Sequence, residues 1–348
     1  MSVGGYLSGT IDGYLSEGSD DLSGMHRYRL KEVVMKHRFG LQRIRLLFQI
    51  LYTIVTNGYV YGYLQGKIYK GPLKYACVPG LNCYSCPGAT FSCPLGALQA
   101  ALNERQIQIP FGVLGFFFIF GSIFGRFVCG WLCPFGLFQD LLHRIPLFHK
   151  RKRLPGHKVL KYGKYLVLVG LVLVGSSVLF TGFAKIPAFC KYLCPSGTLM
   201  GAIPLLGVNE QLQSQIGGLF YWKLGILMGL VILSIKIYRP FCQYLCPLGA
   251  VYGWFNRFSL VQIHWEQDAC ISCDACREAC PVNLGPEQIS VSAECIKCGK
   301  CISVCPTRCL HYGRKPKVEE KHGQVKDMAA TKCKIEQNPN RIDKNENQ

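Results

Sequence analysis

The sequence predicts a mainly α-helical fold, in which a domain of four transmembrane helices precedes a small C-terminal domain. Three observations lead to this prediction. Hydrophobic residues make up 49% of the 348 residues and charged residues only 17%, below the usual quarter for soluble domains. Four windows of about 19 residues are apolar enough to cross a bilayer. The chain also contains 20 cysteines, which are grouped in short motifs rather than spread evenly as in a disulfide scaffold.

The four candidate spans divide the chain into parts. They are residues 46–64, 109–127, 165–183 and 219–237, and the first is the least apolar because it contains Asn57 and several tyrosines. The opening residues contain neither a basic nor an apolar stretch, so no cleavable signal peptide is predicted. We expect a cytoplasmic N-terminal segment (1–45), the membrane domain (46–255), a soluble domain (256–312) and a charged, disordered tail (313–348).

The basic residues indicate how the chain is oriented. Loop 143–164 is densely basic, whereas residues 184–218 contain only Lys185 and Lys191. Because Lys and Arg accumulate in cytoplasmic loops, we expect a multi-pass protein of the cytoplasmic membrane with both termini in the cytoplasm. These loops also account for the net charge of +19. Nucleic-acid binding, which would need a basic face on a soluble domain, is not expected.

The most specific motif lies near the C-terminus. Residues 270–281 have the pattern C-x-x-C-x-x-C-x-x-x-C-P, and residues 295–306 repeat it. This is the spacing of bacterial ferredoxins with two [4Fe–4S] clusters, in which three cysteines bind one cluster and the fourth binds the other. Structural zinc sites are the alternative, but they rarely use three evenly spaced cysteines. The expected ligands are Cys270, Cys273, Cys276 and Cys305 for cluster A, and Cys295, Cys298, Cys301 and Cys280 for cluster B. The predicted fold class is therefore four transmembrane helices followed by a bacterial-ferredoxin-like 2[4Fe–4S] domain.

A shorter motif, C-x-x-x-C-P-x-G, follows the predicted spans as an internal repeat. It occurs as CGWLCPFG, CKYLCPSG and CQYLCPLG, with a degenerate copy in NCYSCPGATFSCPLG. Motifs after the second and fourth spans lie inside, and those after the first and third lie outside. Each complete motif offers two of the four thiolates that a [4Fe–4S] cluster needs. The predicted inner set is Cys129, Cys133, Cys242 and Cys246, and the outer set is Cys190 and Cys194 with two of Cys83, Cys86 and Cys93.

Alternatives exist for both membrane sets. The inner cysteines could be free buried thiols, and the outer ones could form disulfides in an oxidising compartment. Cys77 and the third cysteine of the outer trio are left over and could pair with each other. Cys309 and Cys333 are expected to be bystanders.

These motifs resemble those of a known family. The segments FVCGWLCPFGLFQDLLHRIP and PFCQYLCPLGA, together with the double ferredoxin motif, are similar to the NapH/NosR-type membrane polyferredoxins over roughly residues 40–312. The resemblance implies electron transfer across a bacterial membrane, commonly between a quinol or ferredoxin and an extracytoplasmic redox partner. The large flavin-binding region of the full NosR type is missing here. A separate extracytoplasmic flavoprotein or reductase is therefore a candidate outer partner.

Other cofactors are not expected. None of the eight histidines lies in a predicted span, and a transmembrane haem b needs axial ligands at that depth. No GxGxxG or Walker motif and no catalytic residue is identified. The sequence thus favours electron transfer through [4Fe–4S] clusters between a cytoplasmic or quinol donor and an extracytoplasmic partner. The alternatives are a quinone-reactive oxidoreductase subunit and a redox-sensing assembly or regulatory protein of the membrane.

Overall fold

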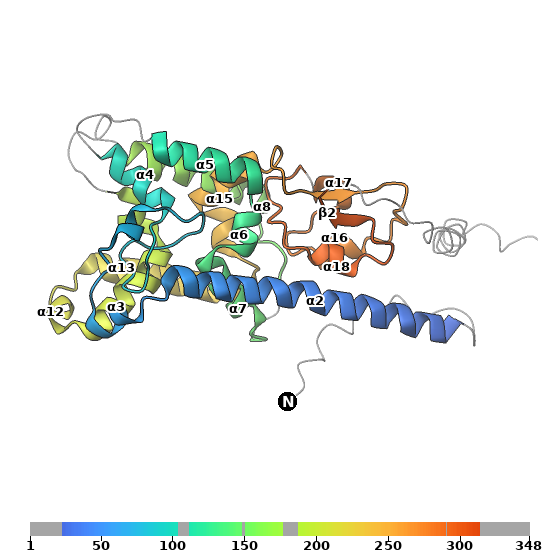
Figure 1. The fold of residues 1–348 in the computed structure, drawn as a ribbon, viewed down its shortest axis with the longest axis horizontal. Helices are drawn as coiled ribbons and strands as arrows, with labels where there is room; N and C mark the ends of the chain where they lie inside the picture. Colours follow the sequence, from blue (N-terminus) through green and yellow to red (C-terminus); the bar gives the residue numbers. More distant parts are fainter. Residues whose placement is uncertain (1–22, 104–110, 148–149, 177–186, 290, 314–348) are drawn as a thin grey trace, which may run out of the picture.

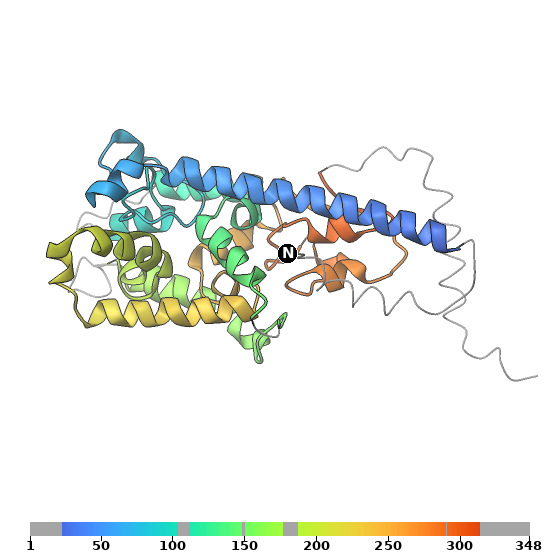
Figure 2. The same ribbon diagram turned by 90° about the horizontal axis from the view of Figure 1, so that it is seen from below.

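The computed structural model describes residues 23–103, 111–147, 150–176, 187–289 and 291–313. It is mainly helical and elongated, with a larger helical body and a smaller C-terminal body at one end (Figure 1). Helix α2 (Ser23–Asn57) runs along both bodies, as the view from below also shows (Figure 2). It packs against α7 of the larger body and α18 of the smaller one.

The larger body is built from helices that surround one hydrophobic core. This core contains residues from both the apolar helices and the cysteine motifs, including Cys129, Cys133, Cys194 and Cys246. Its elements after α2 are α3 (Val60–Gln65), η1 (Pro72–Tyr75), α4 (Pro94–Leu102), α5 (Phe111–Phe124), α6 (Phe127–Trp131), α7 (Pro134–Arg144), α8 (His157–Leu160), α9 (Gly163–Val167), η2 (Leu168–Val174), η3 (Phe189–Leu193), η4 (Gly197–Ala202), α11 (Ile203–Val208), α12 (Glu210–Gln213), α13 (Gly218–Lys236), α14 (Pro240–Tyr244) and α15 (Pro247–Phe255).

The four predicted spans correspond to helices of unequal length. Among the described helices, α13 alone is long and apolar enough to cross a membrane. Within the predicted span 109–127, of which residues 109–110 lie outside the described residues, helix α5 ends at Phe124. The span 46–64 is interrupted between the end of α2 at Asn57 and the start of α3 at Val60. The third span begins as α9 and η2, and its end at 177–183 lies outside the described residues. A four-helix membrane domain stays a prediction.

The Cys-Pro pairs set the starts of three helices. Cys93, Cys133 and Cys246 have extended backbones and are followed by Pro at the first position of α4, α7 and α15. Proline disfavours helical geometry in the residue before it and is well suited to the first helical position, where no amide hydrogen is needed. The motifs at Cys133 and Cys246 therefore fold as a short helix, a break at the second cysteine, and a new helix, whereas a loop precedes Cys93.

The smaller body contains the double ferredoxin motif. Strands β1 (Ile263–Trp265) and β2 (Leu310–Tyr312) pair antiparallel, with His264 opposite His311. Between them lie three short helices, α16 (Ala275–Ala279), α17 (Pro286–Ile289) and α18 (Lys300–Val304). Their apolar side chains form a second small core around the cysteines.

Candidate iron–sulfur sites

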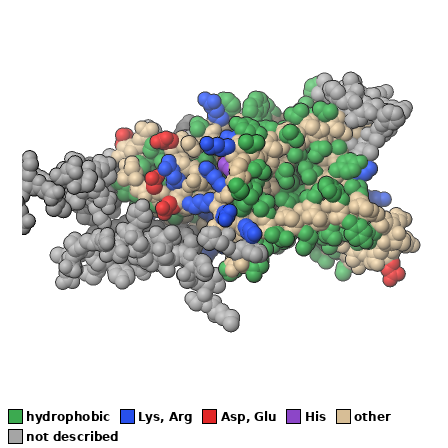
Figure 3. Space-filling model, turned by 180° about the vertical axis from the view of Figure 1, so that it is seen from behind, with side chains coloured by type: hydrophobic (Ala, Val, Ile, Leu, Met, Phe, Trp, Pro, Cys, Tyr) green, Lys and Arg blue, Asp and Glu red, His purple; other side chains and the backbone are tan. Residues whose placement is uncertain are grey.

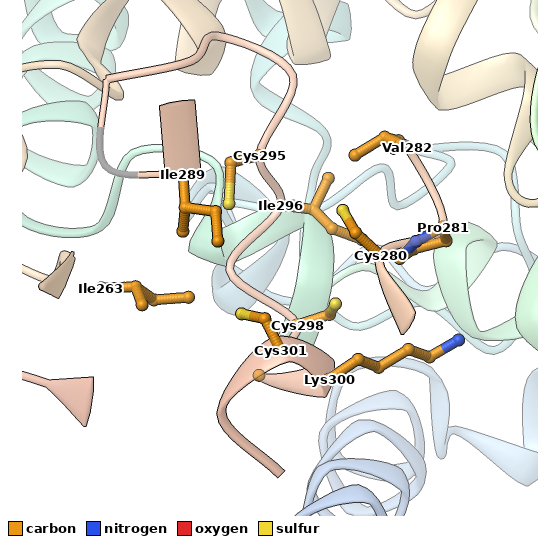
Figure 4. A pocket seen from close by; sticks show the side chains of 11 residues that line it. Ile263, Cys280, Pro281, Val282, Ile289, Cys295, Ile296, Cys298, Lys300 and Cys301 are labelled. Carbon is orange, nitrogen blue, oxygen red and sulfur yellow. The ribbon is translucent and has the colours of Figure 1, made fainter. Parts of the chain in front are cut away.

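The smaller body holds two pockets, and each is lined by one of the cysteine sets expected from the sequence. Figure 4 shows the first, in which the cluster B cysteines lie around one space with Ile263, Ile289 and Ile296. The apolar lining keeps water away from the thiols, which is one means by which a protein sets a cluster's potential. The four cysteines of this pocket are Cys280, Cys295, Cys298 and Cys301.

The second pocket is more polar than the first. Asp274, Arg277 and Glu287 contribute to its wall. Cys309, expected to be a bystander, also lines it, with its Sγ 3.3 Å from that of Cys305. The cysteines of the cluster A set in this pocket are Cys270, Cys273, Cys276 and Cys305.

The donor sets of both pockets fit a cluster better than a single ion. Among the described residues, no three His, Cys, Asp or Glu side chains are arranged to hold one metal ion. A cubane keeps its thiolates farther apart than a tetrahedral ion does, because each sulfur binds a different iron. Four soft sulfur donors around one space are the chemistry that such a cluster requires.

The inner set is brought together from helices far apart in the sequence. Cys129 and Cys133 flank the α6–α7 break, and Cys242 and Cys246 flank the α14–α15 break. All four are buried, and Cys246 lies within electrostatic range of the other three. Burial raises the pKa of Cys133 and of Cys242 to about 11. Iron would have to displace these protons on binding.

The structure distinguishes one of the three candidate cysteines of the outer set from the other two. Cys194 lies within electrostatic range of Cys190, Cys83 and Cys93. Cys86 is directed elsewhere, with its Sγ sharing a 3.2 Å hydrogen bond with the hydroxyl of Tyr63. The outer quartet that the structure assembles is therefore Cys83, Cys93, Cys190 and Cys194.

The remaining cysteines of the outer side form no disulfide. Cys77 and Cys86 are both free thiols, and so are the members of the outer quartet. Cys77 lies beside Ser92, through a parallel bridge between their backbones. Its proposed pairing with the left-over cysteine, Cys86, is not formed. Cys333 lies outside the described residues.

Comparisons with known proteins place the chain in a family. A family model described as a 4Fe-4S binding domain matches residues 106–155, 166–208 and 219–265, and a second model of that description matches residues 263–284. An uncharacterized protein of Methanocaldococcus jannaschii is 30% identical over 63% of this chain and 85% of its own length. The methylamine utilization ferredoxin-type protein MauN of Paracoccus denitrificans is 28% identical over 54% of this chain and 60% of its own. The regulatory protein NosR of Pseudomonas aeruginosa is 33% identical over 37% of this chain and 16% of its own.

The chain belongs to the NapH/NosR-type family of 4Fe–4S electron-transfer proteins. This confirms the resemblance seen in the cysteine motifs, and it establishes iron–sulfur electron transfer as the general function. No solved structure matches the chain.

A glutamine contacts one cysteine in each membrane quartet. Gln139 donates from Nε2 to the Sγ of Cys242 at 3.3 Å, and its Oε1 accepts the backbone N–H of Phe241. Gln99 does the same for Cys190, at 3.2 Å, and for the N–H of Phe189. Both glutamines are buried. Each lies six residues after the second cysteine of its motif, in CPFGLFQ and CPLGALQ, so the internal repeat includes more than the cysteines.

Two buried arginines connect the two motifs of the inner quartet, because each donates to the backbone of the motif to which it does not belong. Arg126, three residues before Cys129, donates to the backbone carbonyl of Cys242 at 2.9 Å. Arg239, three residues before Cys242, donates in turn to the carbonyl of Cys129. Both guanidinium groups are about 1% exposed. This reciprocal pair gives the inner site an approximate twofold symmetry and places two positive charges beside four thiolates.

Each arginine is paired with a carboxylate. Asp140 accepts from Arg239 at 2.5 Å and from Arg45 at 2.6 Å. Burial alone would raise the pKa of Asp140, but the two guanidinium groups lower it to about 2. Glu294 pairs with Arg126 at 3.1 Å and with Lys164. Burial likewise opposes ionisation of Glu294, and these two cations lower its pKa overall.

The inner quartet lies directly against the loop of the cluster B pocket. The indole N–H of Trp131, between Cys129 and Cys133 in the sequence, donates to the carbonyl of Lys297 at 3.0 Å. Gly130 is in such close contact that a Cβ there would overlap the carbonyl oxygen of Ile296. The paired carboxylate Glu294 directly precedes Cys295. The two sites therefore share a dry, tightly packed boundary.

The sequence motifs did not predict a role for these supporting residues, although some of them recur at matched positions of the internal repeat. The arginines occur in matched positions as R-x-x-C-x-x-x-C-P-x-G in RFVCGWLCPFG and RPFCQYLCPLG. The glutamine positions recur in the same way. Aligning the repeats beyond the cysteines would have identified both pairs, but not their partners. Asp140, Lys164 and Glu294 have no such pattern.

Proposed function

We propose that the protein carries electrons across the cytoplasmic membrane through four [4Fe–4S] sites in the order A, B, inner, outer. Bound clusters supply one-electron carriers that the side chains cannot. The observation that supports the order is the packing of neighbouring sites. The loop of pocket B contacts the inner motif through Gly130 and Trp131, and the inner and outer cysteines belong to one hydrophobic core.

The proposed ligands follow the quartets described above. Clusters A and B use the eight cysteines of the smaller body, each set lining its own pocket. The inner site uses Cys129, Cys133, Cys242 and Cys246. The outer site uses Cys83, Cys93, Cys190 and Cys194. Hydrogen bonds from Gln99 and Gln139 would orient the thiolates, and the charges of the two arginines would offset the cost of burying them.

The surface supports a membrane location for the larger body. Apolar side chains cover much of it in Figure 3, and Lys and Arg gather where it meets the smaller body. Exposed apolar residues include Leu51 of α2 and Trp222 of α13, each about 60% exposed. In the basic loop, Lys152 and Arg153 donate to carbonyls of the smaller body. The positive-inside rule then places pockets A and B in the cytoplasm.

The proposed domains are those expected from the sequence, with a membrane domain at 46–255 and a ferredoxin-type domain at 256–312. The proposed topology has both termini inside. A reporter active only in the cytoplasm should give activity when fused after Pro155 and none after Asn209. The reverse pattern would assign the two membrane quartets to the wrong sides.

The proposed electron donor is a cytoplasmic protein or a quinol, and the proposed acceptor is a separate extracytoplasmic flavoprotein or reductase. Relatives named as ferredoxin-type and electron transport proteins support this role. A regulatory role is the second candidate, because two relatives are named regulatory protein NosR. Steady electron transfer from reduced protein to an external acceptor in vesicles would favour the conduit, and its complete absence would favour regulation.

Sharing of ligands between distant helices tests the proposal directly. Anaerobically purified protein should contain about sixteen irons. Replacing Cys133 or Cys246 by Ala should each remove the same four irons and the same redox signal, and the double variant should lose no more, because the residues act as one unit. Cys77→Ala is the matched control and should retain all sixteen. Independent, additive losses would show that the two motifs do not form one site.

A further inference from the structure

The rate of electron transfer across the membrane depends on the distance between the inner and outer sites. A bilayer core is about 30 Å thick, and one electron step over that distance would be very slow. Either another carrier lies between the two quartets, or the chain brings them close together. The segment that precedes Cys83 shows which of these applies.

This segment is held beside the outer quartet by backbone pairing. The amide of Val78 donates to the carbonyl of Ser92 at 3.0 Å, and the amide of Ser92 donates to the carbonyl of Ala76 at 3.0 Å. Ser92 immediately precedes the outer ligand Cys93. The segment 76–83 is thus anchored to the outer site along its first half.

The next residues of the segment reach the inner quartet. Gly80 lies against the α6–α7 break, where a Cβ would be 2.6 Å from the carbonyl oxygen of Leu132 and 3.1 Å from the Cα of Cys133. The backbone amide of Leu81 lies close enough to the Sγ of Cys133 to favour its thiolate form. The backbone amide of the following residue, Asn82, lies in the same way beside the Sγ of Cys93. Two consecutive amides therefore contact one ligand of each quartet.

The space around this link is dry. Leu81 is 2% exposed and Asn82 is fully buried. Tyr252 is also fully buried and lies within electrostatic range of both Cys129 and Cys93, which places it beside the same gap. Its hydroxyl has no hydrogen-bond partner among the described residues. A buried polar group is normally paired, so this hydroxyl is available to a cluster held by one of the two quartets.

We propose that the Leu81–Asn82 peptide is the direct electronic link between the inner and outer sites, with no third carrier between them. With clusters bound, the two quartets would supply the one-electron carriers, and the chain would supply the short covalent path through Leu81 and Asn82 between a cysteine of each quartet. No proton has to move. This inference rests on the proposed function, which supplies the two sites and the donor.

The interaction between the two sites can be measured in the resting protein, independently of turnover. Fully reduced wild type is compared by electron paramagnetic resonance with Cys246→Ala, which lacks the inner site. The outer resonance should show magnetic broadening in wild type that disappears in Cys246→Ala. An outer resonance identical in both proteins would overturn the direct link while leaving the proposed function intact. Absence of an outer resonance from wild type would refute both the link and the outer site.

A matched pair of glycine variants tests the path itself. In Gly80→Ala the new methyl meets the backbone of the inner motif, whereas in Gly96→Ala the nearest atom is 4.0 Å away, on Cys93. We expect Gly80→Ala to weaken the broadening and to slow reduction of the outer site severalfold, with Gly96→Ala unchanged. Broadening and rates equal to wild type in both would show that this segment is not the link. If Gly80→Ala loses iron, the comparison of wild type with Cys246→Ala still tests whether the two sites interact directly.

Discussion

Gln139 offers a direct test of how the inner site is tuned. Its amide donates to the Sγ of Cys242 at 3.3 Å from a position that is 1% exposed. A hydrogen bond to a charged group contributes about 1.5–3 kcal/mol, and it strengthens when the site gains an electron. If about 1 kcal/mol of this appears only on reduction, Gln139→Met should lower the one-electron potential by roughly 40 mV, because 59 mV corresponds to about 1.4 kcal/mol.

The assay is a redox titration followed by electron paramagnetic resonance, in which each site is observed separately. Gln99→Met is the matched variant, because Gln99 makes the same contact with Cys190 of the outer quartet. Gln139→Met should shift only the inner potential and Gln99→Met only the outer one, both downward, with iron content retained. An unchanged inner potential in Gln139→Met, or a shift of the outer one, would refute the reasoning.

Three further predictions concern packing, charge and ligand identity. Gly130→Ala should force Ile296 away from the inner motif and slow reduction of the inner site from pocket B, with iron content unchanged; an unaltered rate would contradict the shared boundary. Asp140→Asn should destabilise the protein by about 3–5 kcal/mol at pH 7, because it leaves two buried guanidinium groups uncompensated. The folded pKa of Asp140 is about 2 and its ordinary value is 3.8, so the ionised carboxylate stabilises the fold above pH 4. The difference in free energy of unfolding between wild type and variant should therefore shrink as the pH falls from 4 to 2. A difference that stays constant over this range, measured by chemical unfolding, would exclude this reasoning. Finally, Cys83→Ala should lower the iron content from about sixteen to about twelve, and Cys86→Ala should leave it unchanged; the opposite result would exchange their roles.

Much of the site could be predicted because its information is local or periodic. The two pockets of the smaller body group the cysteines as the ferredoxin spacing does, since close spacing and the turn at Cys-Pro leave the chain few other ways to fold. The inner quartet was predicted from a different argument. The distribution of Lys and Arg assigned each motif to one side of the membrane. Because a cluster needs four thiolates and each motif offers two, Cys129 and Cys133 were then grouped with Cys242 and Cys246.

The predictions that depended on exact length were less successful. The span 46–64 is broken after Asn57, and the helix within 109–127 ends at Phe124, before the predicted end of the span. Hydropathy reports how apolar a window is, but it does not locate the residue at which a helix stops. The ends are set here by Gly58, by the break before α6 and by packing against the cysteine motifs, none of which a hydropathy window detects.

The sequence by itself determined the chemistry of this protein: thiolate ligands in repeated motifs, an apolar body and a basic boundary. Only the tertiary structure decided which residues meet. It places Cys83 near Cys194 and directs Cys86 to Tyr63. It also places Arg126 and Arg239 so that each donates to the other half of the inner quartet. It also brought the Leu81–Asn82 peptide between two quartets. The physical reason is that ligand type and spacing are properties of a short segment. The hydrogen bonds and charges around a buried cysteine of the inner site instead come from segments more than a hundred residues away, and they exist only once the core has packed.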